Sequence, residues 1–181
     1  MTNALAWSGM SAFVDGFLAA WGGEEPDAAA GRSAVAYASL LSGICLAQTG
    51  LGSVHGLASP LGAFFPIPHG LCCGTLVAAA TAVNIRALQA RRRDAAALEK
   101  YARVGGLLAG KVHASTEERL AALVETLEAW TAELALPRLS AFAMGPADVA
   151  TVVAESRGSS MKTNPVVLTD GEIDAIVRRR V

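Results

Sequence analysis

The 181 residues of this chain suffice for one domain with its own core, and the composition is apolar, with 52% hydrophobic and 17% charged residues. That balance excludes an intrinsically disordered chain. Fifteen Lys and Arg against sixteen Asp and Glu leave a net charge of −1, which excludes nucleic acid as the expected partner, because proteins that bind phosphate backbones normally carry a basic excess.

Helical periodicity runs through most of the chain. Apolar spacing and helix-start residues predict helices over residues 7–20, 33–49, 94–109, 116–136, 146–156 and 169–180. The clearest of these follows an N-cap at Ser115 or Thr116 and stops at Pro137. The sequence shows neither alternating β-branched runs nor a GxGxxG phosphate loop. It therefore predicts an all-α fold, a multi-helix bundle forming a single domain over residues 1–181 without a dinucleotide-binding domain.

One long segment of the chain carries no charge. The fifty-three residues between Arg32 and Arg86 contain no Asp, Glu, Lys or Arg, so we expect them to be buried in protein or in lipid. Residues 34–54 and 71–85 are the apolar runs, but the second is shorter than the roughly 20 residues that span a bilayer. The Pro-rich stretch between them also disfavours lipid contact. We expect a buried helical layer with a Gly/Pro-rich loop and no membrane, and keep a two-helix membrane protein as the alternative.

The loop between those runs, LGSVHGLASPLGAFFPIPHG, holds two histidines, His55 and His69. A buried imidazole needs a hydrogen-bond partner or a metal ion. Glycine follows each histidine, and three prolines stiffen the chain between them. On spacing alone, the pair is compatible with satisfied core histidines or with two metal ligands.

This loop resembles the metal-binding loop of the iron-containing alcohol dehydrogenase family, whose members carry a pattern close to LGxxHAxxHPLGxxxxxPHG. Other pieces agree in the same order. SGMSAFVD at residues 8–15 resembles the family's SGMDAxxH helix, Asn84 falls on a family Asn, and SSMKTNP at residues 159–165 resembles its NP segment. The resemblance covers essentially the whole chain.

The resemblance implies a function. Members of this family, like the related glycerol dehydrogenases and dehydroquinate synthases, pair an N-terminal α/β dinucleotide domain with a helical C-terminal domain that carries Fe²⁺ or Zn²⁺. The ion acts as a Lewis acid on the substrate oxygen while hydride passes to or from NAD(P). The chain then resembles only the metal-binding domain of such an enzyme. The resemblance implies that the complete enzyme interconverts a small alcohol and its aldehyde or ketone. NAD(P) would come only through a missing domain, so we expect the chain by itself to be inactive.

The resemblance also implies site residues. His55 and His69 match two family metal ligands. The family's Asp ligand falls on Ser11, a poor donor, and its helical His ligand falls on Asp15, a good one. The implied metal set is therefore Asp15, His55 and His69, with Ser11 in doubt. Ser59 occupies the position of a family His implicated in proton relay, the catalytic position of this site.

Several other residues receive plainer interpretations. Cys72-Cys73 stands where the family commonly has Asn-Ala, and we expect two small buried residues, with a thiolate ligand from Cys72 as a weaker alternative. Three cysteines without a disulfide pattern, and an N-terminus without signal-peptide features, favour the cytoplasm. We expect residues 91–93 to be a solvated helix end, Trp7 and Trp130 to be core, and His113 to be exposed.

A non-catalytic alternative stays open. Because Ser11 and Ser59 replace functional residues, the chain would then be a degenerate helical scaffold or a small-molecule-binding dimer. Its surface toward a dinucleotide domain would be covered by a second copy, since large apolar patches associate. A homo-oligomer or a separate dinucleotide domain is therefore the expected partner. The sequence leaves open iron or zinc, the substrate, and whether the chain is a natural truncation or an excised domain.

Overall fold

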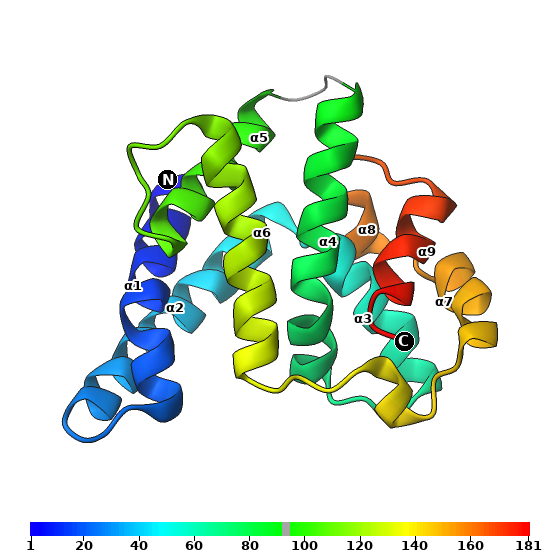
Figure 1. The fold of residues 1–181 in the computed structure, drawn as a ribbon, viewed down its shortest axis with the longest axis horizontal. Helices are drawn as coiled ribbons and strands as arrows, with labels where there is room; N and C mark the ends of the chain where they lie inside the picture. Colours follow the sequence, from blue (N-terminus) through cyan, green and yellow to red (C-terminus); the bar gives the residue numbers. More distant parts are fainter. Residues whose placement is uncertain (92–94) are drawn as a thin grey trace. The chain divides into compact units, whose positions relative to one another are not determined.

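The computed structural model describes residues 1–91 and 95–181, and in these two ranges every regular element is a helix (Figure 1). The prediction of an all-α fold is therefore confirmed. The chain divides into two compact units, residues 1–50 and residues 51–181. Whether the two units count as one domain over residues 1–181 stays a prediction, and each unit is described by itself.

The N-terminal unit is a hairpin of α1 (Thr2–Gly22) and α2 (Asp27–Thr49). Both predicted helices are present and begin earlier than their apolar patterns indicate. The helices approach closely at Gly16 and Gly31. A Cβ built on Gly16 would lie 2.8 Å from the Gly31 carbonyl oxygen, and one on Gly31 would lie 2.7 Å from the Gly16 carbonyl oxygen. Glycine is therefore required at this crossing.

Helix α2 corrects the expectation that the charge-free segment is buried throughout. Only a few of its residues are buried, and Leu40, Ile44 and Leu46 are 63%, 45% and 42% exposed. Both α2 and α4 (His69–Arg91) are long and apolar enough to cross a membrane. In the most apolar 18-residue stretch of each helix, 72% of the residues of α4 are buried inside the protein, against 17% of those of α2. Helix α4 is thus a core helix of the folded C-terminal unit.

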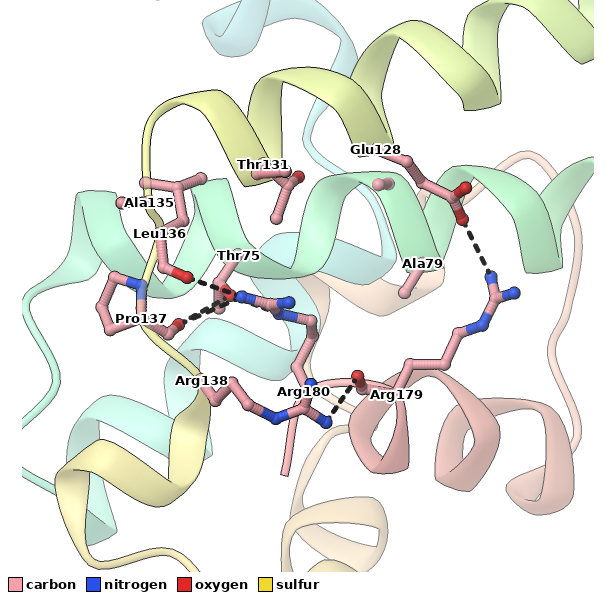
Figure 2. Close-up of a pocket in the computed structure, with 12 residues that line it drawn as sticks. Thr75, Ala79, Glu128, Thr131, Ala135, Leu136, Pro137, Arg138, Arg179 and Arg180 are labelled. Carbon is pink, nitrogen blue, oxygen red and sulfur yellow. Dashed lines mark hydrogen bonds and ion pairs between the residues drawn. The ribbon is translucent and has the colours of Figure 1, made fainter.

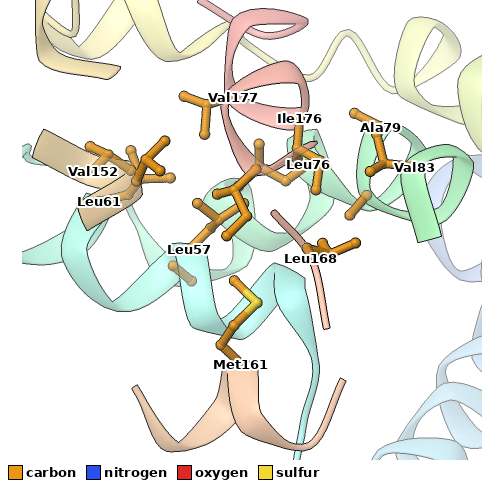
Figure 3. Packing of buried hydrophobic residues seen from close by; sticks show 14 of the residues in the cluster. Leu57, Leu61, Leu76, Ala79, Val83, Val152, Met161, Leu168, Ile176 and Val177 are labelled. Carbon is orange, nitrogen blue, oxygen red and sulfur yellow. The ribbon is translucent and has the colours of Figure 1, made fainter. Parts of the chain in front are cut away.

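In the C-terminal unit, α4 is central and contacts α3 (Ser53–Phe64), α5 (Ala95–Leu108), α6 (Thr116–Glu133) and α9 (Asp170–Arg178). Shorter elements complete it: η1 (Leu139–Phe142), η2 (Pro146–Asp148), α7 (Val149–Glu155) and α8 (Ser159–Lys162). Figure 3 shows the core, in which aliphatic side chains from five of these helices meet: Leu57, Leu61, Leu76, Ala79, Val83, Val152, Met161 and Ile176.

Residues 53–64 form helix α3 where a Gly/Pro-rich loop was expected, and only residues 65–68 are irregular. Pro60 lies inside the helix, which costs about 3 kcal/mol because its nitrogen donates no hydrogen bond and its ring crowds the preceding turn. Leu57 and Leu61 are both 0% exposed, and burying each such side chain contributes about 1.5–3 kcal/mol. Tertiary burial therefore outweighs the local preference for a loop.

The helices with strong local signals are confirmed. Ser115 caps α6 and Thr169 caps α9, each in a capping box with the glutamate three residues later. The prediction for residues 146–156 corresponds to η2 followed by α7. Residue 94, the expected start of α5, lies outside the described residues. Trp7 and Trp130, expected in the core, are only partly buried, and His113 is exposed as expected.

Arg91 forms an ion pair and is not the solvated helix end that was expected. Its Nη2 donates to both carboxylate oxygens of Glu172, at 2.7 and 2.6 Å, and its Nη1 donates to the Val167 carbonyl oxygen at 2.7 Å. The contact ties the end of α4 to the first turn of α9. Residues 92 and 93, from the same prediction, lie outside the described residues.

We expect Glu172→Gln to weaken the acid dependence of stability. Burial raises the pKa of the Glu172 carboxyl, but hydrogen bonds from Thr169 and Arg91 outweigh it and hold that pKa below its ordinary value. A depressed folded-state pKa gives stability that is present at neutral pH and lost as pH falls through it. Denaturant unfolding should show the variant about 1 kcal/mol less stable at pH 7, with a smaller loss of stability between about pH 5 and pH 3. Glu155→Gln, at an exposed position, is the control; an unchanged acid dependence in Glu172→Gln would contradict the assignment.

Candidate metal centre

One cavity of the C-terminal unit, of about 620 Å³, lies between α4, α6 and the C-terminal residues (Figure 2). Arg180 lines this cavity. Its guanidinium group donates to Thr75 Oγ1 and to the Leu136 carbonyl oxygen, both at 2.7 Å. Arg179 pairs with Glu128 across 3.7 Å. The guanidinium groups are thus engaged in joining the C-terminal segment to the helices, which is a structural role.

A second cavity, of about 570 Å³, is lined by His55, Asn84 and Asn164, three of the residues noted in the sequence. It lies between the start of α3, the helices α4 and α5, and residues 164–165. Its lining is mainly apolar with a polar patch, and comprises Leu51, Gly52, Ser53, Val54, His55, Cys73, Gly74, Val77, Ala80, Thr81, Asn84, Tyr101, Asn164 and Pro165. An apolar cavity with a few convergent polar groups is the usual form of a small-molecule site.

The two histidines meet where α3 packs against α4. His55 lies in the first turn of α3, and His69 is the first residue of α4. Residues 65–68, two of them proline, reverse the chain between the helices. The imidazole rings consequently lie 5.3 Å apart, centroid to centroid, with their planes inclined at 51°. The sequence interpretation of His55 and His69 as a pair therefore has a geometric basis.

Cys73 adds a third donor that sequence reasoning missed. It follows His69 by four residues on α4, so both side chains lie on one face of the helix. Its Sγ is 3.6 Å from His69 Nε2, and the donor atoms of His55, His69 and Cys73 all lie within 4.8 Å of one another. The four-residue spacing is the sequence signal that identifies it. Cys72, the alternative thiolate considered from sequence, is 0% exposed in the hydrophobic core.

Burial and charge set the protonation of these groups. Burial, with a smaller contribution from His69, lowers the pKa of His55, which favours the neutral imidazole that a metal ion requires. Burial raises the pKa of the Cys73 thiol, and burial together with Cys73 raises the pKa of Cys72 to about 12. Without a bound cation both thiols stay protonated at neutral pH, so neither is a reactive nucleophile.

The remaining predicted site residues lie elsewhere. Ser59 is exposed on α3, one turn after His55, and does not line the cavity. Ser11 and Asp15 are exposed on α1, one turn apart, in the N-terminal unit. The structure thus brings His55 and His69 together, while the assignment of Asp15 as a ligand stays a prediction.

A hydrogen-bonded amide pair, the buried Asn84 and the half-buried Asn164, forms the polar wall of the cavity. Asn164 Nδ2 donates to Asn84 Oδ1 at 2.9 Å, and Asn84 Nδ2 lies 3.2 Å from Asn164 Oδ1. Asn164 Oδ1 also accepts the Ser53 backbone N–H at 3.0 Å, and the Tyr101 hydroxyl lies 3.1 Å from Asn84 Nδ2. Burial raises the pKa of Tyr101, so the hydroxyl stays neutral. The pair holds the start of α3, and therefore His55, against α4 and α5.

We expect Asn164→Ala to destabilise the C-terminal unit by about 2–4 kcal/mol, because the substitution leaves two buried groups, Asn84 Oδ1 and the Ser53 N–H, without their hydrogen-bond partner. Equilibrium unfolding in urea measures the loss. Lys162→Ala, at an exposed position nearby on α8, is the matched control and should stay within about 0.5 kcal/mol of the wild type. Equal stability of the two variants would contradict the role of the amide pair.

Sequence comparisons find related proteins with a named activity. The model for the C-terminal part of the Fe-containing alcohol dehydrogenase family matches residues 1–181. Alcohol dehydrogenase 4 of Saccharomyces cerevisiae (strain ATCC 204508 / S288c) is 32% identical over 94 residues, which cover 51% of this chain and 24% of that protein. The 1-propanol dehydrogenase PduQ of Salmonella typhimurium is 30% identical over 148 residues, covering 78% of this chain and 38% of that enzyme.

Solved structures share the fold. A 1,3-propanediol oxidoreductase superposes with a TM-score of 0.84 at 23% identity, over 99% of this chain and 45% of that one. The alcohol dehydrogenase from Oenococcus oeni gives a TM-score of 0.83 at 19% identity, over 99% and 45% of the two chains. The chain spans less than half the length of each of these four proteins. It belongs to the Fe-containing alcohol dehydrogenase family and matches the C-terminal part of that family along its whole length.

Proposed function

We propose that the chain is the metal-bearing part of an NAD(P)-linked alcohol dehydrogenase that interconverts a small alcohol and its aldehyde or ketone. The observation that carries this proposal is that the imidazole rings of His55 and His69 lie 5.3 Å apart, with His55 lining a mainly apolar cavity. Membership of the family supports it, as do the named activities of the relatives, among them a 1-propanol dehydrogenase.

The donor set fits the expected ion. Neutral imidazole binds both Fe²⁺ and Zn²⁺, and a carboxylate is an acceptable third donor for either. His55 and His69 would hold the ion, and the family resemblance adds Asp15 as a further proposed ligand. When bound, the ion supplies Lewis-acid polarisation of a substrate oxygen.

Apart from holding the ion, the chain would bind the substrate. The apolar side chains of Leu51, Val54 and Val77 line the cavity, where they would cover the alkyl part of a small alcohol and exclude water. Ser59 stands at the family's relay position, but it is exposed and does not line the cavity, so we propose no proton transfer through it.

We propose that the dinucleotide is bound by a part outside residues 1–181, in the same polypeptide or in a separate chain. The sequence carries no glycine-rich phosphate loop of the GxGxxG type. We propose that this arrangement works in the cytoplasm, and that residues 1–181 alone turn over no substrate.

The proposal is tested by joining residues 1–181 to a dinucleotide-binding portion from a relative. Residues 1–181 are joined to the N-terminal portion of the PduQ relative, loaded anaerobically with Fe²⁺ or Zn²⁺, and assayed for NAD(P)H formation with 1-propanol and other short alcohols. We expect alcohol-dependent turnover that falls more than about 100-fold in His69→Ala, since the substrate oxygen loses its ion. A folded, metal-loaded chimaera without turnover on any short alcohol would contradict the catalytic proposal.

A second candidate function is a non-catalytic homodimer. It is favoured by the exposed apolar stripe of Tyr37, Leu40 and Ile44 on α2, which are 47%, 63% and 45% exposed at helical spacing. In this alternative the stripe is covered by a second copy. Sedimentation equilibrium should then show a dimer that Leu40→Glu dissociates, and a strictly monomeric wild-type chain at high concentration would exclude it.

A further inference from the structure

We propose that Cys73 Sγ is the third ligand of the cation held by His55 and His69, so that the C-terminal unit by itself forms a His₂Cys site that favours zinc. The inference rests on the proposed metal-binding role of the two histidines. It concerns which atoms hold the ion, and does not depend on turnover.

The backbone fixes all three side chains near one point. His69 and Cys73 are one helical turn apart in the first two turns of α4, so their side chains project from the same face. His55 is presented by the first turn of α3, which the short turn at residues 65–68 folds back against α4. The amide pair behind the cavity holds the start of α3 through the Ser53 N–H. All three donors thus come from packed helices.

The separations match a tetrahedral ion. With Zn–N near 2.05 Å and Zn–S near 2.3 Å, tetrahedral angles place a sulfur and a nitrogen donor about 3.6 Å apart and two nitrogen donors about 3.3 Å apart. The distance from Cys73 Sγ to His69 Nε2 is 3.6 Å, and no two of the three donor atoms are more than 4.8 Å apart. A side-chain adjustment of the order of 1 Å therefore closes the cluster on an ion, with no movement of the helices.

The same 3.6 Å contact is also the length of a sulfur hydrogen bond between the Cys73 thiol and His69. In that arrangement the thiol keeps its proton and contributes nothing to cation binding. The two arrangements differ in one measurable respect, which is whether a bound ion has a sulfur ligand.

The neighbouring cysteine provides a discriminating comparison. Cys72 has the same side chain one residue earlier, but it is completely buried among the aliphatic residues of the core. Cys73 is only partly buried and lines the cavity. A thiolate ligand at this site must therefore be Cys73.

The donor chemistry determines the preferred ion. Binding breaks the S–H bond of Cys73, releases one proton to solvent and forms a sulfur–metal bond without any change of oxidation state. The resulting thiolate is a soft anionic ligand, which suits zinc better than ions that prefer oxygen donors. Three protein ligands leave one tetrahedral position for water or substrate oxygen, as catalytic zinc sites require. Asp15 then becomes a fourth donor only for an ion of higher coordination number.

The test uses Co²⁺ as a spectroscopic substitute for Zn²⁺ in the whole chain. We expect the wild type to bind one equivalent and to show a thiolate-to-cobalt charge-transfer band in the near ultraviolet. Cys73→Ser should lose that band, retain weaker visible cobalt absorption, and bind Zn²⁺ roughly 100-fold less tightly in a chelator competition. Cys72→Ser should keep the band. Circular dichroism and urea unfolding establish that each variant is folded.

The outcomes distinguish a failure of the Cys73 assignment from a failure of the histidine metal site. Cobalt binding by the wild type without a charge-transfer band overturns the role of Cys73 and leaves the histidine site intact. A band that persists in Cys73→Ser, or that disappears in a folded Cys72→Ser, also overturns it. Failure of the wild type to bind Co²⁺ or Zn²⁺ at all overturns both this inference and the metal part of the proposed function.

Discussion

His69→Ala should lower the affinity of the chain for Zn²⁺ by roughly 10²–10³-fold, and His55→Ala should do the same. A zinc site is worth about 10–16 kcal/mol in total, so the loss of one of a few ligands removes several kcal/mol. Competition with a chromophoric chelator measures the affinity, and elemental analysis after dialysis measures the retained metal. The wild type should keep close to one equivalent and each variant almost none.

His113→Ala is the matched control for this prediction. His113 is exposed and lies outside the donor cluster, so its loss should leave metal content and affinity unchanged. Retention of one tightly bound equivalent in His69→Ala would show that the ion binds elsewhere. The close approach of His55 and His69 would then be a feature of helix packing and not a metal site.

Gly105→Ala should be the most destabilising single-methyl addition in the C-terminal unit, with a loss of about 3 kcal/mol or more. A Cβ at this position would lie 1.9 Å from the Arg119 carbonyl oxygen and 2.9 Å from Leu123 Cβ. A backbone carbonyl and a Cβ, both fixed to the main chain of α6, are not flexible groups that can give way, so α5 and α6 must separate. Because α5 also carries Tyr101, the wall of the cavity should loosen with it.

Gly62→Ala provides the comparison. Gly62 lies in α3, and a Cβ built there meets nothing within 4 Å. Alanine has a higher helix propensity than glycine, so the variant should be more stable by about 0.5–1 kcal/mol. Urea unfolding of both variants tests the pair. Similar stabilities for Gly105→Ala and Gly62→Ala would contradict the close packing of α5 on α6.

Local sequence signals predicted the helices whose ends are set by local contacts. Helices α6 and α9 carry capping boxes at Ser115 and Thr169, and each begins directly after its cap. Helix α3 was missed because Pro60 and the surrounding glycines favour a loop locally, whereas the helix is stabilised by complete burial of Leu57 and Leu61. Burial depends on residues distant in sequence, and a local pattern does not contain it.

The site was predicted in part for similar reasons. The resemblance identified His55 and His69, and the structure places their rings together. Cys73 was treated as a small buried residue although its spacing from His69 places both on one helix face. The hydrogen bond between Asn84 and Asn164 joins residues 80 positions apart, so only the folded chain reveals it. Asp15 stays a prediction, to be tested by the metal affinity of Asp15→Asn.

The most direct measurement is X-ray diffraction at the zinc absorption edge from crystals of the zinc-loaded chain, because anomalous scattering locates the ion itself. We expect one zinc ion between His55 and His69, with two nitrogen ligands at about 2.0–2.1 Å and the Cys73 sulfur at about 2.3 Å. A zinc ion bound elsewhere, or no anomalous peak beside the two imidazoles in a fully loaded crystal, would contradict the claim that this cluster is the metal centre.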